Sequence, residues 1–397
     1  MEKNQHIMPK FNDLQLAVKA VEQTPTPFYY YDLDLLHETL ETINRLTTGL
    51  PYKVHYAIKA NGNPRIVHEI ARYGLGADLV SGGEIIAAVE AGIAPEKMNF
   101  SGVGKTDREI RTGLEHNIGF FNVESIPELE VINQIAGEMN KTARIAIRVN
   151  PDIDAHTHSY ITTGTAENKF GINIEELPRV IELSRSLPHI CLGGLHFHLG
   201  SQITDMRPFA LLCDTINRLL DEYEQQGIHF EVINVGGGLG IDYNHPDERP
   251  LPDLEAYFNI FKQGIRLRPQ QEVHFELGRA IVGSCGTLIS SVVYVKENRN
   301  KKFVILDAGM NNLIRPALYG AHHEVQNLTS REQEQEKYDV VGPVCESSDV
   351  FVRDHIMPKT RRGDIIAIRT AGAYGESMSS TYNMRPLVPS VFHCSHR

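Results

Sequence analysis

Eight short segments rich in β-branched and aromatic residues alternate with longer segments whose apolar residues have helical spacing. The expected strands are 53–59, 76–80, 99–101, 119–124, 143–150, 191–199, 231–237 and 272–278. Strand and helix alternating eight times is typical of an α/β fold of the (β/α)8 barrel type. Active-site residues of such barrels lie at the carboxyl ends of the strands, so the polar residues there are the candidates for a site.

The chain is longer than one barrel requires. At 397 residues it exceeds the roughly 250 residues that an α/β barrel takes up. After residue 280 short strands follow one another without long helices, which indicates a β domain, and the strand-like PFYYYD before the barrel is expected to pack with it. The sequence therefore predicts a barrel over residues 36–278 and a sandwich-like or barrel-like β domain built from residues 1–35 and 279–397.

Composition excludes several classes of protein. The chain is 41% apolar and 22% charged, as in ordinary globular proteins, and its net charge of −11 gives no basic surface for nucleic acid or anionic lipid. No stretch approaches the roughly 20 apolar residues that span a bilayer, and the first residues contain no apolar signal core. The five cysteines form no CxxC pair, so neither a disulfide framework nor a zinc knuckle is expected. We expect a cytoplasmic protein with small-molecule partners.

Lys59 ends the first expected strand, where alternation places it on the inward face with Ala57 and His55. A lysine buried in a barrel is costly unless its pKa falls or its amine forms a bond, and a Schiff base is such a bond. The alternative is a lysine at the barrel mouth whose amine reaches water. Considered alone, the position favours this alternative.

Features suited to phosphate follow the seventh and eighth strands. The run Gly236, Gly237 and Gly238 in NVGGGLG exposes backbone N–H groups without side-chain obstruction, as a phosphate cradle requires. ELGR places Arg279 directly after the eighth strand. Because barrels commonly bind phosphate in these two loops, the pair of features predicts a phosphate site.

Glu276 stands at the mouth of the eighth strand, which we expect to lie opposite Lys59. A carboxylate bonded to a pyridine nitrogen keeps that nitrogen protonated, and the cationic ring then accepts the electrons left when carbon dioxide departs. An ion pair with Arg279 or Arg148 explains Glu276 equally well. The residue types leave both roles open.

Two histidines, His196 and His198, end the sixth strand on one face in HFHLGSQ. His-x-His on a barrel strand is also a metal-ligand arrangement, so a metal-dependent hydrolase with a carbamylated lysine is a competing hypothesis. That hypothesis leaves the glycine run unexplained. An imidazole can instead lie flat on an aromatic cofactor ring while Ser201 bonds a phosphate.

A set of motifs from about residue 28 to residue 386 resembles the diaminopimelate decarboxylases, relatives of ornithine and arginine decarboxylases with an alanine-racemase-like barrel. The motifs are YAIKAN, GADLVSGGE, FSGVGK, NVES, RVNPDIDAHTHSYITTG, NKFGI, GLHFHLGSQI, NVGGGLGIDY, DAGMNNLIRPALYGAHH, VVGPVCESSDVF and AGAYGESMSSTYNMRP. The resemblance implies decarboxylation of meso-2,6-diaminopimelate at its D-configured centre to give L-lysine. It also implies pyridoxal 5′-phosphate as the cofactor and no metal ion.

The resemblance implies a role for each cofactor-binding residue. Lys59 forms the Schiff base, His198 stacks on the pyridine ring, and Glu276 meets the pyridine nitrogen. The remaining expected cofactor contacts, most of them around the phosphate, are Ser201, Gly236, Gly237, Gly238, Gly278, Arg279 and Tyr374. Of these, Tyr374 is expected to lie close to the substrate as well.

The substrate-binding residues are likewise implied by the resemblance. Diaminopimelate carries two carboxylates, and the family matches them with Arg279, Arg315 and Tyr319; planar guanidinium groups suit carboxylates. Cys345 matches a thiol that protonates the carbanion, and Glu346 matches a carboxylate that grips the distal ammonium. Both are donated across the interface of a homodimer, so shared active sites are expected.

Two departures from the family pattern stand out. Leu277 occupies a position where the family usually has proline, and we expect little effect because the flanking residues match. The end of the chain, LVPSVFHCSHR, also diverges, and the sequence predicts no role for it.

Three alternative functions remain open. They are a related decarboxylase of a polyamine or siderophore precursor, a metal-dependent hydrolase and a non-catalytic pyridoxal-phosphate-binding regulator.

Overall fold

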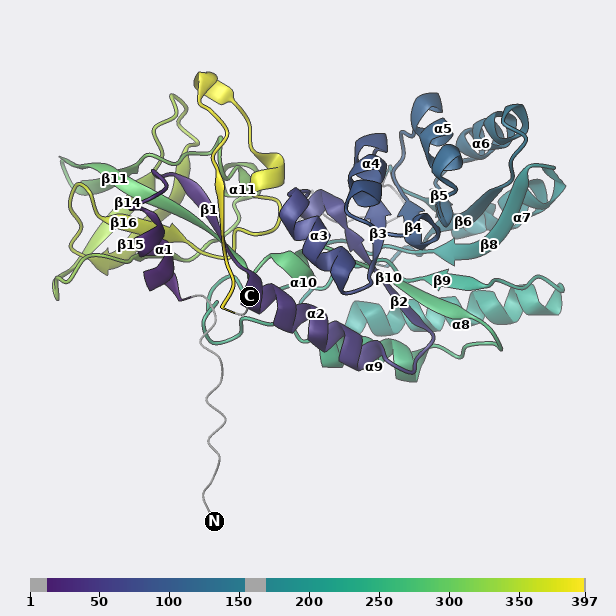
Figure 1. Ribbon diagram of the computed structural model, residues 1–397. Helices are drawn as coiled ribbons and strands as arrows, with labels where there is room; N and C mark the ends of the chain where they lie inside the picture. The colour runs from purple at the N-terminus through teal and green to yellow at the C-terminus, as the bar shows by residue number, and fades with distance from the viewer. Residues whose placement is uncertain (1–12, 154–168, 396–397) are drawn as a thin grey trace, which may run out of the picture. The chain divides into compact units, whose positions relative to one another are not determined.

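A computed structural model describes residues 13–153 and 169–395 (Figure 1). The described residues form two compact units. One contains Leu40–Ile241 and Pro252–Ile281, and the other contains Asp242–Leu251 together with the described residues up to Thr39 and from Val282 onward. The sequence predicts an independently folding barrel domain bounded by residues 36 and 278, and these bounds stay a prediction. Among the helices in these described ranges, none is long and apolar enough to cross a membrane.

The first unit is a closed barrel of eight parallel strands, which confirms the predicted fold. Around the ring lie β5 (Phe120–Val123), β4 (Met98–Phe100), β3 (Gly76–Leu79), β2 (Tyr52–Ala57), β10 (Glu272–Leu277), β9 (Val232–Asn234), β8 (Ile190–His196) and β6 (Ala143–Asn150). Pairing of β5 with β6 closes the barrel, and the short β7 (Ile172–Asn173) extends from β6. Strands β3, β4, β5 and β9 are buried along their whole length, as expected of strands covered on both faces.

Helix α2 (Leu33–Thr47) precedes the first barrel strand, and its residues up to Thr39 belong to the β-sheet unit. The helices that follow barrel strands are α3 (Pro64–Arg72), α4 (Gly82–Glu90), α5 (Asp107–His116), α6 (Ile126–Glu138), α7 (Leu177–Ser186), α8 (Arg207–Gln225), α9 (Leu254–Gly264) and the short α10 (Arg279–Val282). Side chains of Ser81, Thr106 and Ser125 cap α4, α5 and α6 by accepting a backbone N–H, and Glu109 completes a capping box with Thr106. These caps fix the loops at the carboxyl ends of the strands.

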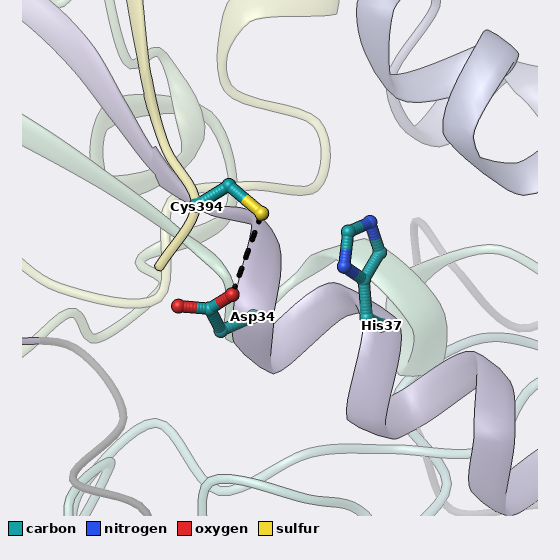
Figure 2. Close-up of side chains that lie close together, drawn as sticks. All are labelled: Asp34, His37 and Cys394. Atoms are coloured by element: carbon teal, nitrogen blue, oxygen red, sulfur yellow. Dashed lines mark hydrogen bonds between the residues drawn. The ribbon is translucent and has the colours of Figure 1, made fainter. Parts of the chain in front are cut away.

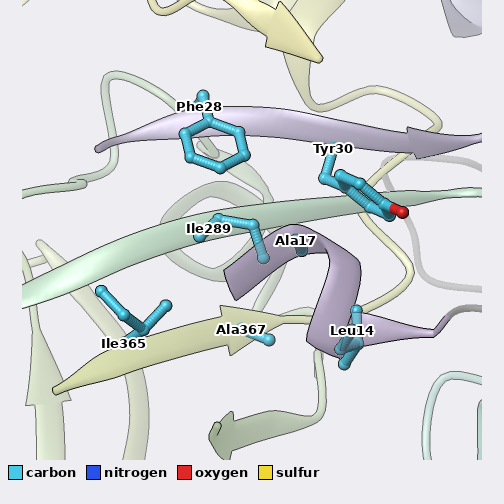
Figure 3. Packing of buried hydrophobic residues seen from close by; sticks show 7 residues of the cluster. All are labelled: Leu14, Ala17, Phe28, Tyr30, Ile289, Ile365 and Ala367. Carbon is cyan, nitrogen blue, oxygen red and sulfur yellow. The ribbon is translucent and has the colours of Figure 1, made fainter. Parts of the chain in front are cut away.

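The second unit is a mixed β-sheet. Its strands lie in the order β13 (Val325–Asn327), β16 (Ile365–Ile368), β11 (Gly286–Asn298), β12 (Lys301–Leu306), β14 (Gln335–Val341) and β15 (Val350–Pro358). The N-terminal strand β1 (Phe28–Asp32) pairs with β11 and with β17 (Ser390–His393), so it joins this sheet as predicted. Helix α1 (Leu14–Ala20) covers the sheet there, with Leu14 and Ala17 packed in one cluster with Phe28, Tyr30, Ile289, Ile365 and Ala367 (Figure 3).

Three details of the predicted strand ends are wrong. β2 ends at Ala57, and Lys59 lies in the 3-10 turn η1 (Ile58–Ala60), so strand alternation does not set its direction. β8 ends at His196, and His198 follows the strand. Because the barrel closes, β2 and β10 are paired neighbours, with Glu276 beside His55, and Glu276 therefore does not lie opposite the lysine.

Candidate active site

A buried carboxylate, that of Glu276, accepts three hydrogen bonds at the end of β10. Asn122 and Asn234 each donate a side-chain N–H to its Oε1, at 3.1 and 2.6 Å. His196 Nε2 donates to its Oε2 at 3.0 Å. The three donors come from β5, β9 and β8, so polar side chains of three other barrel strands meet at this one carboxylate.

These contacts keep Glu276 ionised. Burial alone raises the pKa of a carboxyl group, but His196 and Asn234 hold the pKa of Glu276 well below its usual value. A carboxylate offers about four lone-pair positions, so three hydrogen bonds leave room for one more donor. A protonated pyridine nitrogen is such a donor, and the site fits it.

Lys59 lies close to a second buried carboxylate. Its Nζ is 3.6 Å from Oδ2 of Asp78, which ends β3 and also accepts a hydrogen bond from Ser101. Burial and the negative charge of Glu276 raise the pKa of Asp78 to about 6, while the charge of Lys59 opposes this shift. Asp78 can therefore exchange a proton near neutral pH, next to the lysine amine.

The turn that carries Lys59 packs against the end of β10. A Cβ added at Gly278 would lie 3.0 Å from the Cβ of Ala60 and 3.2 Å from that of Ala57, so glycine permits this close approach. The Lys59 side chain is 39% exposed, which corrects the expectation of an inward, buried lysine. It matches the alternative of a lysine at the barrel mouth, where a cofactor can reach the amine.

The glycine run after β9 is required by close packing. A Cβ at Gly237 would collide with the backbone carbonyl of Glu276, and Gly238 has φ +104°, which L-residues rarely adopt. The N–H groups of Gly236 and Gly237 point to Asn234 Oδ1 and His198 Nδ1, at 2.9 and 3.2 Å. The expectation that all three glycines expose N–H groups for phosphate is therefore too simple. Two of these groups already bind neighbouring side chains.

His198 is held as a neutral ring. Its Nδ1 accepts the N–H of Gly237, and burial together with the positive charge of Arg148 places its pKa well below the ordinary value. A neutral imidazole is suited to stacking on a cationic ring because it adds no like charge. The stacking role that the resemblance implies for His198 stays a prediction.

Arg279 and Ser201 are in contact within the barrel unit. Arg279 begins α10 and donates from Nη2 to Ser201 Oγ at 3.1 Å. Arg148 lies 3.0 Å from Oε1 of Glu124, in a buried ion pair. The sequence left open an ion pair of Glu276 with Arg279 or Arg148. In the structure Glu276 instead accepts hydrogen bonds from two amides and an imidazole.

In the β-sheet unit, Arg315 is buried at the start of α11 (Arg315–Tyr319). His323 accepts its Nη1–H at 2.9 Å while donating Nδ1–H to the carbonyl of Arg369. The ring of Tyr243 lies 4.8 Å from the guanidinium carbon. These contacts fix the guanidinium, and α11 ends at Tyr319, the other residue predicted on this element.

Cys345 and Glu346 lie on an exposed loop between β14 and β15. The backbone N–H of Cys345 is donated to Asn383 Oδ1 at 2.9 Å. Buried Asp349 accepts the N–H groups of Val344 and Met310 at 2.7 and 2.6 Å, which fixes the base of the loop. Hydrogen bonds to its backbone therefore fix the loop, while the side chains of Cys345 and Glu346 are exposed.

Tyr374 follows β16 in the motif AGAYGES and has φ +57°. A non-glycine residue in this left-handed region is uncommon, and such backbone persists only where its surroundings hold it. The neighbouring Gly372 and Gly375 pack so closely that a Cβ on either would meet backbone atoms. The segment is thus fixed around Tyr374.

Comparison with known proteins places the chain in a family. Residues 35–283 match the family model for the pyridoxal-dependent decarboxylase, pyridoxal binding domain. A diaminopimelate decarboxylase of Bacteroides thetaiotaomicron is 57% identical over 91% of this chain and 94% of its own length. The chain belongs to the diaminopimelate decarboxylase family. Its cofactor is accordingly pyridoxal 5′-phosphate.

Solved structures agree with this family. The diaminopimelate decarboxylase of Helicobacter pylori complexed with L-lysine has a TM-score of 0.90 and 39% identity, covering 95% of this chain and 94% of that one. A relative from Aquifex aeolicus is 40% identical over 95% of this chain and 89% of its own length. Family membership rules out the metal-dependent hydrolase and the non-catalytic regulator as readings of the chain.

The structure brings further residues to the site in roles that sequence reasoning did not predict. Asn122, Asn234 and His196 position Glu276, and Asp78 lies beside Lys59. The available signal was their place: each is a polar residue at the carboxyl end of a strand that is otherwise apolar. Residues 154–164 of the motif RVNPDIDAHTHSYITTG lie outside the described residues.

Proposed function

We propose that this protein removes carbon dioxide from the D-configured centre of meso-2,6-diaminopimelate and releases L-lysine, as the last step of lysine biosynthesis. The observation that carries the proposal is Glu276, a buried carboxylate kept ionised beside the Lys59 turn in a member of this family. An ionised Glu276 is what a cofactor with a protonated pyridine nitrogen needs. The expected compartment is the cytoplasm.

Pyridoxal phosphate, when bound, supplies an aldehyde for the substrate amine and a cationic ring that accepts the electron pair left by carbon dioxide. Lys59 would hold it covalently, and Glu276 would hold a proton on the pyridine nitrogen. Asp78 Oδ2, 3.6 Å from Lys59 Nζ, would take up a proton from the amine; burial and Glu276 raise the pKa of Asp78 to about 6, which makes it a stronger base than an ordinary aspartate.

The phosphate would be held by Ser201, Arg279 and the loop of Gly236, Gly237 and Gly238. Ser201 and Arg279 already contact each other through Oγ and Nη2. None of the three glycines carries a side chain that would obstruct a phosphate approaching the loop backbone. His198 would cover one face of the ring.

The substrate's carboxylates require cationic partners, and we assign these to Arg279 and Arg315, assisted by Tyr319 and Tyr374. The guanidinium of Arg315 is preorganised by His323, so little side-chain entropy is lost when a carboxylate binds. A substrate without a distal carboxylate would forgo the charged hydrogen bonds that this guanidinium can donate. The assignment therefore favours diaminopimelate over ornithine.

We assign the proton donor to Cys345 and the ligand of the distal ammonium to Glu346, each supplied to the partner's active site in a homodimer. Both side chains are exposed in the single chain. Beside them, apolar side chains also face solvent: Tyr382 is 48%, Met384 95% and Leu387 60% exposed. An interface at this loop would cover these apolar residues and place the thiol in a neighbouring site.

The proposal is tested by carbon dioxide release from meso-diaminopimelate, compared with LL-diaminopimelate, ornithine, arginine and lysine. We expect turnover of the meso isomer alone, with lysine as the product. The Lys59→Ala variant serves as the control for enzyme-independent release. Faster turnover of ornithine or arginine than of diaminopimelate would overturn the substrate assignment and indicate a polyamine-type decarboxylase.

A further inference from the structure

Three metal-ligating side chains meet at the end of the chain, within the β-sheet unit. Asp34 and His37 lie at the start of α2, and Cys394 follows β17. One ligand atom from each lies within 4.8 Å of the other two, and Cys394 Sγ is 3.5 Å from Asp34 Oδ1. Figure 2 shows the Cys394 and Asp34 side chains directed toward each other, with His37 one turn further along the helix.

Local structure places these residues together. Asp34 and His37 are three positions apart on one helix, so they share a face. β17 pairs in parallel with β1, with His393 opposite Asp32, and this register brings the tail to the first turn of α2. The backbone N–H of Ser395 is donated to both carboxylate oxygens of Asp34, at 3.2 and 2.9 Å. The backbone of the tail is therefore bound directly to the Asp34 carboxylate on the helix.

We propose that Asp34, His37 and Cys394 bind a zinc ion. A thiolate, an imidazole and a carboxylate are ligands that zinc accepts together, whereas magnesium and calcium favour oxygen ligands only. A thiolate, a carboxylate and a neutral imidazole carry two negative charges, which balance the charge of the ion. Three protein ligands leave the fourth tetrahedral position to water.

The present spacing is close to what zinc requires. Bond lengths of about 2.0–2.3 Å place tetrahedral ligands roughly 3.3–3.8 Å apart. The Cys394 to Asp34 distance already lies in that range, and the widest separation in the group is at most 4.8 Å. All three residues are only partly buried. Side-chain rotations that move the His37 and Cys394 ligand atoms by about 1 Å therefore cost little.

The competing explanation is a hydrogen-bonded anchor for the tail. The Cys394 thiol then donates to Asp34, and His393, whose Nε2 lies 4.0 Å from Asp34 Oδ2, contributes positive charge when protonated. Under this explanation the cluster needs no ion and binds none. The two explanations differ in how the protein responds to added zinc.

Zinc binding to the chelator-treated holoenzyme, measured by isothermal titration calorimetry with zinc chloride, tests the proposal. We expect one site per chain, weakened roughly 10- to 100-fold or more by Cys394→Ser, by His37→Ala and by Asp34→Asn. Cys191→Ser, which removes an exposed thiol elsewhere, is the matched control and should leave the affinity unchanged. Zinc binding that none of the three substitutions weakens, or no binding at all, would overturn the proposal.

Two further measurements separate a zinc site from a change in folding. Cobalt added in place of zinc should give a thiolate-to-metal charge-transfer band in the wild-type minus Cys394→Ser difference spectrum, in which cofactor absorbance cancels. Zinc should also slow amide hydrogen exchange in residues 390–395 of the wild type but not of Asp34→Asn. A cobalt complex without the band would remove Cys394 from the site, and equal exchange with and without zinc would leave the anchor explanation standing.

Discussion

The barrel and the β-sheet unit contribute candidate active-site residues in different ways. In the barrel, Glu276 is buried and receives hydrogen bonds from three other strands. In the β-sheet unit, the side chains of Cys345 and Glu346 are exposed on a loop whose backbone N–H groups are held by Asp349 and Asn383. A site whose residues are all buried within one chain needs no second chain. Exposed side chains proposed for catalysis become part of an enclosed site only when another chain packs against them. The predictions below test this division, from the largest expected effect to the smallest.

Lys59→Ala should reduce carbon dioxide release to the uncatalysed level, because it removes the amine that holds the cofactor. The side chain is 39% exposed and fills no core, so the variant should keep the wild-type melting temperature of the cofactor-free protein. Circular dichroism and cofactor absorbance measure the two effects. A folded variant that still turns over substrate would remove the barrel's main contribution to the site.

Cys345→Ala should lower kcat by about 10²–10⁴ and leave KM largely unchanged, the pattern of a lost general acid. Cys191→Ala, another exposed cysteine, is the matched control and should behave like the wild type. Steady-state kinetics with meso-diaminopimelate give both constants. If the two variants lose activity equally, the loop has no specific chemical role.

Arg315→Ala should raise KM for diaminopimelate by roughly 10- to 150-fold, since a charged hydrogen bond to a carboxylate contributes about 1.5–3 kcal/mol. Cofactor absorbance should stay near the wild-type value. His323→Gln, which keeps the guanidinium but disturbs the contact that orients it, should raise KM less. Parallel loss of bound cofactor in Arg315→Ala would move this residue out of the substrate site.

Burial of polar groups in the barrel should also make it sensitive to acid. Burial and the nearby His274 lower the pKa of His55 from 6.5 to about 3. Between pH 6.5 and pH 3, His55 is protonated in the unfolded chain but neutral in the folded chain. The free energy of unfolding therefore falls as the pH drops from 6.5 toward 3, by at most about 1.4 kcal/mol per pH unit.

His55→Gln should therefore be less stable at pH 7 but lose less stability between pH 7 and pH 5 than the wild type. Urea unfolding at the two pH values measures the difference. His229→Gln, at an exposed position, is the control and should keep the wild-type slope. Equal slopes in wild type and His55→Gln would show that His55 is not the group responsible.

Sequence patterns predicted the barrel better than its chemistry. Parallel strands buried on both faces leave a clear apolar signal, and β6 (Ala143–Asn150) matches its predicted range residue for residue. The strand ends were less predictable, because the turn at Lys59 depends on packing against Gly278, which no local pattern encodes. In the β-sheet unit, β15 (Val350–Pro358) was not anticipated, since its mixed polar and apolar residues match a half-exposed strand and a loop alike.

The partners of Glu276 could not be derived from the sequence either. Asn122, Asn234 and His196 are far from it in the chain, and only closure of the barrel brings them to one carboxylate. Motifs common to the family identified Lys59, Arg279 and the glycine run without this information. The roles of these residues stay predictions until they are measured.

The central claim is that the barrel of one chain and the Cys345 loop of its partner form each active site. It is tested by mixing Lys59→Ala and Cys345→Ala proteins, each nearly inactive, under conditions in which subunits exchange. The account predicts recovery to about a quarter of wild-type activity, because half of the dimers are mixed and each of these has one complete site. Activity that stays absent after exchange has been demonstrated, for example by mass spectrometry of the mixed dimer, would contradict it.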